Sequence, residues 1–550
     1  MAMGIATRAS KSNFCRLHYK KVCPPAFLQK QEGEVDLAAV SEIFASRRLP
    51  SILGGNIAKK DADGFSYWAA EPKEVFEFWA GEKDPFEKLQ KALARYKFAE
   101  DFDMDSRLRG NDKKEEILRS AQNDKDINDL TEGIFRGGWI GYFSYDLGRY
   151  IEKLPESVPR PSWPWYHGLE ARDTNLRMPL IRLCFYDKVV AYDHIKRIFW
   201  LIALELPNDA ERPEVKLAGL EQILTESKGV RVPQPTAADI EKVDFSQIKT
   251  NMDKDYYLQA VKKIKRHIYD GDVYQINFSQ RFECDFRTNP IDLFHWQNRY
   301  NPSGYAAYID GGKFHIVSAS PEMFVTIQDG FIQTKPIKGT RPRLSDTGEG
   351  KEINTKNFDE LLDSEKEQAE LNMIIDLERN DVARICRPGT RKVIQPRTIE
   401  TYPTVFHAVA TVGGRLREDI TFCDVLKAMF PGGSITGAPK IRVMEIINET
   451  EPTARGLYTG SIGYIGLDGS VCLNIAIRTI IIAGKKAFAQ TGGGIVADSD
   501  PQAEWDETIT KARALIAGIR AIQNTKFEIR STKQIRMTKV QNSKQDVLDI

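Results

Sequence analysis

A short segment that holds one lysine between two prolines is the first candidate for chemistry. Residues 335–343 read Lys-Pro-Ile-Lys-Gly-Thr-Arg-Pro-Arg. Pro336 and Pro342 restrict the backbone at both ends, and Gly339 permits a close approach or an unusual dihedral angle beside Lys338. An amine shielded from water loses its proton more easily and can then act as a nucleophile or a base. The alternative is an ordinary surface loop, and these residues alone do not decide between the two.

Two predicted helices each carry a pair of glutamates three residues apart. The helix predicted from Ser364 carries Glu367 and Glu370, and the last predicted helix carries Glu504 and Glu507. Residues at this spacing share a helix face. Four carboxylates brought together would repel one another unless a cation lay between them, and so few oxygen ligands suit Mg²⁺ with waters completing its shell. The alternative is two solvated acidic faces, which are common on exposed helices.

Glycine-rich segments and basic side chains indicate a site for a small anion. Residues 491–496 precede the last predicted helix, and residues 430–440 precede another. Free backbone N–H groups at helix entrances bind carboxylates or phosphates. The second segment is not a P-loop, because Gly-Lys-Ser/Thr is absent and its lysine follows a proline. Arg478, which we predict in a buried strand, needs an anionic partner, and Lys511 adds a second cation. Together with a metal, these groups indicate a polycarboxylate ligand.

The elements that must position these residues alternate between strands and helices. Periodicity and turn residues predict helices at residues 85–96, 257–270, 364–377, 421–430, 439–447 and 500–522. They predict strands at 65–70, 135–145, 180–185, 197–204, 274–282, 305–309, 316–318 and 324–328. Residues 457–482 are expected to form two long strands about the turn Asp468-Gly469. Pattern alone indicates a mixed α and β fold.

Composition divides the chain into regions. We expect a first region at 35–240 and a second at 245–525, which holds every candidate above, followed by a polar tail at 526–550. Residues 101–131 are charged and nearly free of aromatic side chains, so we predict a disordered insert there.

The bulk composition excludes several classes of protein. Lys and Arg number 78 against 77 Asp and Glu, so no global basic field marks a nucleic-acid binder. No run of apolar residues approaches the length of a membrane span, so we expect no membrane association. Residues 1–25 are basic but lack the apolar core of a secretory signal. The 7 cysteines are scattered without paired spacing, which favours a reducing cytoplasm over a disulfide framework or a zinc site.

Six ordered motifs resemble the chorismate-utilising enzymes over roughly residues 40–520. They are Gly-Asp-Val-Tyr-Gln-Ile-Asn from 271, Ser-Pro-Glu from 320, Pro-Ile-Lys-Gly-Thr-Arg-Pro-Arg from 336, Asp-Leu-Glu-Arg-Asn-Asp-Val-Ala-Arg from 376, the segment 430–440, and Glu-Trp-Asp-Glu-Thr from 504. The resemblance implies an α/β (α+β) fold in which two large antiparallel sheets, built by both halves of the chain, pack as a sandwich with helices outside. It also implies an enzyme that binds chorismate and Mg²⁺.

The same resemblance assigns roles residue by residue. Glu370 and Glu507 match the Mg²⁺ ligands, with Glu367 and Glu504 in support, and Glu322 matches the general acid/base that helps the C4 hydroxyl of chorismate to leave. Because that group must carry a proton to give, we expect a raised pKa for Glu322. The positions that match the lining of the chorismate site are His407, which is also a catalytic candidate, Ser434, Tyr458, Arg478, Gly493, Gly494 and Lys511.

Two positions separate the branches of that family. Gln275 stands where branches that use water place a lysine, which argues for ammonia as the nucleophile. Lys338 stands where the branch that makes anthranilate usually has alanine, and it resembles the branch that makes 4-amino-4-deoxychorismate for 4-aminobenzoate and folate synthesis. No cysteine lies in a Gly-flanked nucleophile turn, so we expect a glutamine amidotransferase subunit, component II, as partner. The alternatives are the anthranilate branch and an inactive chorismate-binding scaffold.

Overall fold

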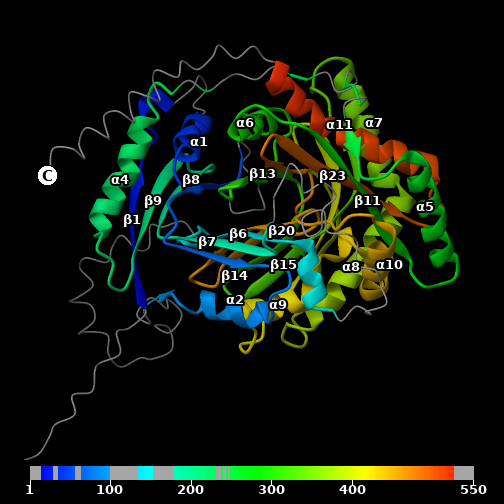
Figure 1. Ribbon diagram of the computed structural model, residues 1–550, viewed down its shortest axis with the longest axis horizontal. Coiled ribbons are helices and arrows are strands. Elements are labelled where there is room, and N and C mark those ends of the chain that lie inside the picture. Colours follow the sequence, from blue (N-terminus) through cyan, green and yellow to red (C-terminus); the bar gives the residue numbers. More distant parts are fainter. Residues whose placement is uncertain are drawn as a thin grey trace, which may run out of the picture.

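Two large sheets stack face to face, and helices cover their outer faces (Figure 1). The computed structural model describes residues 14–28, 35–55, 64–98, 133–152, 178–230 and 248–524, with a few residues between 232 and 245. The predicted insert at 101–131 and the predicted tail at 526–550 lie outside these residues. The described part confirms the expected fold class.

The first sheet has 13 strands within the described residues and combines both halves of the chain. Its only parallel pair there is β1 with β5, and the other pairs are antiparallel. The order of its strands is β10 (Lys249–Thr250), β11 (Gln275–Asp285), β23 (Lys486–Ile495), β22 (Thr479–Ala483), β13 (Phe314–Ser320), β12 (Tyr305–Asp310), β2 (Ser51–Leu53), β3 (Phe65–Ala69), β8 (Lys188–Asp193), β9 (Ile198–Glu205), β1 (Phe14–Val22) and β5 (Lys97–Phe98), with β19 (Gly437–Ala438) beside β11.

The second sheet has 10 strands in the described residues and is also shared between the halves. The two halves meet where β6 pairs with β20. The order of its strands is β16 (Ile337–Pro342), β18 (Val405–Arg415), β15 (Phe331–Lys335), β14 (Met323–Gln328), β21 (Val471–Asn474), β20 (Ser461–Gly466), β6 (Gly138–Phe143), β7 (Ile181–Tyr186) and β4 (Glu74–Phe78), with β17 (Lys392–Thr401) beside β18.

Helices pack on the outer face of each sheet (Figure 1). Those against the first sheet are α1 (Leu37–Ala45), α4 (Pro213–Glu226), α5 (Lys254–Tyr269), α6 (Pro290–Tyr300), α10 (Lys440–Thr450) and α11 (Pro501–Asn524). Those on the side of the second sheet are α2 (Pro85–Leu93), α7 (Glu349–Asp363), α8 (Glu365–Ala383) and α9 (Phe422–Met429). No helix among the described residues combines the length and the apolarity that crossing a membrane requires.

Apolar side chains fill three layers. One cluster lies between the sheets and includes Tyr142 and Tyr464 from the second sheet and Trp200 from the first. A second cluster lies between the first sheet and its helices, and a third lies between the second sheet and its helices. This burial stabilises the sandwich by roughly 25 cal/mol for each Å² of apolar surface removed from water.

Local sequence signals explain where the two helices that position the site begin. The Ser364 hydroxyl accepts from the N–H of Glu367 at 3.4 Å and caps α8. Asp500 accepts from the N–H of Ala503 at 2.9 Å and caps α11. These are the starts that the sequence predicts, because a short polar side chain satisfies N–H groups that have no partner within the helix.

One prediction at the element level is wrong. Residues 457–482 do not form two long strands: the hairpin about Asp468-Gly469 joins β20 to β21, but β21 ends at Asn474. The chain then crosses to the other sheet and begins β22 at Thr479. The apolar run Ile475-Ala476-Ile477 looks like a continuing strand, although two of these side chains are simply buried in the crossing segment.

Candidate active site

The candidate residues gather where one end of each sheet lies between helices. Gln275 lies on β11 and Gly493 and Gly494 lie on the neighbouring β23, near the end of the first sheet. Lys338 lies on β16 and His407 on β18, at the end of the second. The remaining candidates come from α8, from α11 and from the loops that join the two sheets. Segments far apart in the sequence thus supply one site.

A chain of hydrogen bonds joins the two strongest candidates. The Ser434 hydroxyl donates to Glu322 Oε1 at 2.6 Å, and Lys338 Nζ donates to the Ser434 carbonyl at 3.0 Å. The N–H of Ile337 also donates to Glu322 Oε1 at 3.3 Å. Ser434 lies on the short 3₁₀ helix η9 (Gly433–Ile435), so this turn fixes the separation between the lysine and the glutamate.

Burial shifts the pKa of each of the two groups in the direction that favours its neutral form. Glu322 is buried, and the loss of hydration raises its pKa, while the Ser434 hydrogen bond and Lys338 act in the opposite direction. Lys338 is partly exposed, yet burial is still the largest influence on it and lowers its pKa, against the attraction of Glu322 and Glu370. Because burial penalises a charge of either sign, it favours a protonated acid beside an unprotonated amine. The raised pKa that the sequence predicts for Glu322 is confirmed in direction.

The backbone of β16 explains why a glycine follows Lys338. Gly339 has φ +96°, which is strained for any residue with a side chain. A Cβ atom there would lie 2.8 Å from Leu361 Cδ1 and 2.9 Å from Glu367 Oε2. The register against β18 also shifts between Ile337 and Thr340, so Lys338 lies at an irregularity in the ladder.

The four predicted metal ligands come from two helices and point to the same region. Glu370 and Glu507 both influence the Lys338 amine electrostatically. Glu504 is buried, and burial raises its pKa, while Ser499 donates to its Oε1 at 2.7 Å. Glu507 also forms an ion pair with Lys511 at 2.6 Å.

One carboxylate oxygen in this group is a candidate ligand for a cation. Glu367 Oε1 accepts from Arg341 Nη1 at 2.7 Å, but its Oε2 is buried without a hydrogen-bond partner. A carboxylate oxygen in that state is costly unless a ligand satisfies it. Within the described residues no three acidic, histidine or cysteine side chains lie close enough to bind one ion together. Carboxylate oxygens are ligands of the kind that Mg²⁺ takes together with waters.

Gly494 on β23 lies next to the side-chain amide of Gln275 on the neighbouring strand β11. A Cβ atom at Gly494 would lie 2.4 Å from Gln275 Nε2, and one at Gly493 would lie 2.7 Å from Glu504 Oε2. Gln275 is buried, and its Nε2 has no partner in the part of the chain that the structure describes. Lys511 Nζ donates to the Gly492 carbonyl at 3.0 Å, which orients the amine at this edge. The side-chain N–H group of Gln275 is thus a hydrogen-bond donor without a partner among the described residues, and it lies beside the glycine backbone of β23.

The structure corrects the prediction for Arg478. It does not lie in a buried strand but in the crossing between β21 and β22, with φ +48° and an exposed side chain. No ion pair joins it to a carboxylate of the described residues. The change of sheet explains its place, and the result is a cation available to an anionic ligand.

The other two predicted lining residues are buried. Thr340 Oγ1 and His407 Nδ1 share a hydrogen bond of 2.8 Å between β16 and β18, and the His407 ring lies edge-on to Tyr402 at 5.4 Å. Tyr458 is buried, and burial raises its pKa to about 12. The contacts of His407 are those of a well-satisfied core histidine one strand away from Lys338.

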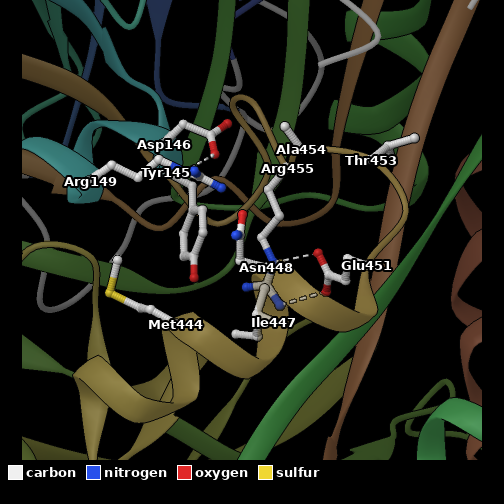
Figure 2. A pocket seen from close by; sticks show the side chains of 10 residues that line it. All are labelled: Tyr145, Asp146, Arg149, Met444, Ile447, Asn448, Glu451, Thr453, Ala454 and Arg455. Carbon is white, nitrogen blue, oxygen red and sulfur yellow. Dashed lines mark hydrogen bonds and ion pairs between the residues drawn. The ribbon is translucent and has the colours of Figure 1, made fainter. Parts of the chain in front are cut away.

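Arg455, a buried residue that we did not predict from the sequence, links several elements behind the site. Arg455 binds both oxygens of Glu451, at 2.8 and 3.0 Å, and donates to the Ile435 carbonyl at 3.1 Å and to the Asn277 carbonyl. Figure 2 shows it between Glu451 and the ring of Tyr145, which is 4.7 Å away, beside a cavity of about 20 Å³. It ties α10, η9 and β11 together. Glu451 and Arg455 lie beyond the end of α10, so no helical spacing in the sequence marked their contact.

The chain is similar over most of its length to enzymes that use chorismate. The chorismate binding enzyme family matches residues 65–517. Anthranilate synthase component 1 from Pseudomonas putida is 39% identical over 398 residues, which cover 71% of this chain and 76% of the relative. Aminodeoxychorismate synthase component 1 from Bacillus subtilis (strain 168) is 40% identical over 382 residues, which cover 69% and 76% respectively.

Solved structures show the same architecture. Anthranilate synthase component I from Streptococcus pneumoniae TIGR4 superposes with a TM-score of 0.62 at 28% identity, covering 84% of this chain and 93% of that chain. The menaquinone-specific isochorismate synthase MenF from Escherichia coli shares the fold, with a TM-score of 0.60 at 14% identity, covering 94% and 96%.

The family match and the shared fold identify an enzyme of the class that binds chorismate. The chain belongs to the chorismate binding enzyme family.

Proposed function

We propose that this protein converts chorismate and ammonia to 4-amino-4-deoxychorismate, as an aminodeoxychorismate synthase component I. The observation that carries the proposal is the arrangement of Lys338. Burial lowers the pKa of its amine, and the Ser434 turn holds it beside the buried Glu322, whose pKa burial raises. A neutral amine next to a protonated carboxyl suits a displacement that needs both a nucleophile and an acid.

The proposed reaction uses these groups in two displacements. Lys338 Nζ attacks C2 of chorismate, the ring double bonds shift, and the C4 hydroxyl leaves as water with the proton of Glu322. Ammonia then adds at C4, the double bonds shift back, and the bond between C2 and Lys338 breaks. The amine protons lost in the two additions restore Glu322 and the lysine. A covalent intermediate divides one difficult displacement into two easier ones.

Charged and polar groups around this pair would hold the substrate. Arg478 has no carboxylate partner in the described structure, and Gln275 keeps an unused N–H donor beside Gly493 and Gly494. These groups suit the enolpyruvyl carboxylate of chorismate, with His407, Tyr458 and Lys511 around them.

The acidic helices are proposed to hold Mg²⁺. Glu370 and Glu507 would bind the ion, and Glu367 and Glu504 would support them. When bound, Mg²⁺ supplies a Lewis acid that binds the ring carboxylate of chorismate. The unsatisfied Oε2 atom of Glu367 supports an ion in this region.

We further propose a glutamine amidotransferase subunit as the source of ammonia. Several relatives carry the designation component 1, which implies a second component. All 7 cysteines of this chain are free, and burial raises the pKa of five of them, which disfavours a thiolate nucleophile at those five positions. Free cysteines also accord with a cytoplasmic location, which we propose.

Formation of anthranilate is the second candidate, because several relatives at comparable identity are named anthranilate synthase component 1. Product analysis by mass spectrometry after incubation with chorismate, Mg²⁺ and ammonium separates the two. We expect the mass of 4-amino-4-deoxychorismate, which keeps the enolpyruvyl group. Anthranilate together with pyruvate would contradict the proposal in favour of the second candidate, and unchanged chorismate would contradict both.

A further inference from the structure

A buried acidic cluster lies directly behind the turn that carries Ser434. Glu378 and Asp381 lie on the inner side of α8, and both are buried. Lys440, at the start of α10, donates to Asp381 Oδ2 at 2.7 Å and to the Met429 carbonyl at 3.0 Å. The proposed reaction assigns no role to any of these residues.

Glu378 is the member of the cluster that touches the turn. Its carboxyl group lies against the backbone of Gly433, whose N–H favours the charged form of the carboxyl. A Cβ atom at Gly433 would lie 3.3 Å from Glu378 Oε1 and 2.4 Å from Leu377 Cδ2, so α8 packs tightly against this point. Gly433 is followed by Ser434, whose hydroxyl and carbonyl meet Glu322 and Lys338.

The surroundings keep Glu378 neutral. Burial, with the negative charges of Asp381 on its own helix and of Glu322 beside β14, raises the pKa of Glu378 to about 8, against the attraction of Lys440 from α10. Burial raises the pKa of Asp381 as well, but its direct contact with the Lys440 ammonium opposes that shift. Glu378 has no ion pair of this kind among the described residues, so its protonated form is favoured, and in that form it would face Gly433 without adding a charge next to Glu322.

We propose that Glu378 is a positioning residue: its buried carboxyl group accepts the Gly433 N–H and fixes η9, so that Ser434 holds Glu322 and Lys338 at their working separation. The proposal rests on the proposed function, because it assumes that Glu322 and Lys338 react with chorismate. It applies equally if the product is anthranilate, since the same acid would act.

Two variants separate hydrogen bonding from packing. Glu378→Gln keeps an acceptor of the same size and removes the ionisation, whereas Glu378→Met keeps the length and removes the acceptor. Asp376→Asn, on the exposed face of the same helix, is the matched control. Consumption of chorismate at saturating ammonium is measured from pH 6 to 10 for each variant, for Ser434→Ala and for Ser434→Ala combined with Glu378→Met.

We expect Glu378→Met to lower kcat by about tenfold to a hundredfold, as a small displacement of a catalytic group does, with a small change in KM. Glu378→Gln and Asp376→Asn should stay close to wild type. The Ser434 hydrogen bond lowers the pKa of Glu322. Loosening that bond should therefore raise the pKa and move the alkaline limb of kcat to higher pH, in Glu378→Met as in Ser434→Ala. The double variant should be no worse than Ser434→Ala alone.

Three results would overturn the proposal: equal kcat for the Met and Gln variants, an unshifted alkaline limb in Glu378→Met, or additive effects in the double variant. Wild-type protein that consumes no chorismate would instead overturn the proposed function.

If Glu378→Met does not fold, the pH dependence of the stability of wild type and of Glu378→Gln provides the test. A neutral Glu378 makes wild type lose stability as pH rises from about 4.5 to about 8, so the advantage of Glu378→Gln should grow over that range. A constant difference would contradict a neutral Glu378.

Discussion

Lys338 and Glu322 depend on the same physical feature of the site, which is exclusion of water. Burial lowers the pKa of the lysine and raises that of the glutamate, so each is brought toward the state that the proposed reaction needs. Each also favours the charged form of the other, which limits both shifts. Substitution of either residue therefore changes the protonation of its neighbour as well as removing a functional group.

The first prediction concerns the nucleophile. Lys338→Ala should lower the rate of product formation by at least ~10³-fold, because it deletes the atom that would bond to C2. Lys338→Arg should fail as well, since a guanidinium group stays protonated and is a poor nucleophile. Ammonium-dependent turnover measures both effects, and chorismate binding serves as the folding control. Near-normal turnover by the alanine variant would remove Lys338 from covalent catalysis and favour the anthranilate reaction.

The second prediction concerns Glu322. Glu322→Gln should lower kcat by roughly 10²–10⁴-fold, because the amide has no proton to donate at the C4 hydroxyl. The same variant should gain stability relative to wild type as pH rises above about 4.5, the ordinary pKa of a glutamate. The raised pKa means that folded wild type holds a proton that the unfolded chain releases, so wild type loses stability over that range. Denaturant unfolding at several pH values tests this, and a constant difference would contradict a raised pKa.

Sequence reasoning found the residues of this pair but not the contact that couples them. Short motifs identify Lys338, Glu322 and Ser434 as candidates, since glycine and proline mark the local backbone. Whether Ser434 faces substrate or Glu322 depends on how η9 packs on α8, which is a long-range contact. Arg478 shows the same limit, because only the sheet order reveals that its segment changes sheets.

At the scale of elements, α8 and α11 each present acidic side chains to the site. The third prediction is that Glu370→Gln or Glu507→Gln weakens Mg²⁺ binding and abolishes metal-dependent turnover, because each removes a charged oxygen donor. Isothermal titration calorimetry with Mg²⁺ alone gives a measure that does not depend on activity. Glu365→Gln, on the exposed first turn of α8, is the control. Full activity in the presence of EDTA would show that these faces are only solvated.

A buried ion pair connects α4 to the first sheet. The fourth prediction concerns the contribution of this ion pair to stability. Lys216 is fully buried and contacts Asp187 at 2.6 Å, Asp209, and the Leu204 carbonyl at 2.6 Å. Lys216→Met should lower the free energy of unfolding by about 3–5 kcal/mol, because two carboxylates lose their counter-charge. Lys20→Met removes the exposed pair with Glu221 and should cost at most ~1 kcal/mol. Equal effects in denaturant unfolding would contradict the role of burial.

Helices were predicted more accurately than strand connections, for a physical reason. The start of α11 follows from Asp500 and Pro501, and the end of α5 from Gly271, because caps and breakers act within a few residues. The partner of a strand depends on residues far away in the sequence. The run from 471 to 482 is mostly apolar, and the polar residues in it, such as Asn474 and Arg478, do not by themselves mark a change of sheet at 475–478.

At the scale of the whole molecule, both sheets interleave strands from the two halves. β2 pairs with β12 in one sheet, and β6 pairs with β20 in the other. The resemblance to a known family predicted two shared sheets, whereas periodicity could not give their strand order. The predicted regions at 35–240 and 245–525 therefore describe stretches of sequence whose strands complete common sheets.

The fifth prediction concerns the source of nitrogen. The purified chain should use ammonium salts but not glutamine, because no cysteine lies in a Gly-flanked nucleophile turn and burial raises the pKa of five of the 7 cysteines. Turnover with each nitrogen source, measured by chorismate consumption, tests this, and addition of a glutamine amidotransferase subunit should confer use of glutamine. Glutamine-dependent turnover by the pure chain alone would contradict the prediction.

The pairing of β6 with β20 also sets a condition on synthesis. β6 and its neighbour β7 leave the ribosome close together, but Phe143 pairs with Ser461, which is translated far later. At roughly 5–20 residues per second the nascent chain waits tens of seconds for that partner. During this interval β6, whose side chains are all buried in the finished protein, has an open apolar edge that can pair with other chains. The topology that joins the halves so firmly therefore requires that the unfinished protein be kept from aggregating while it is made.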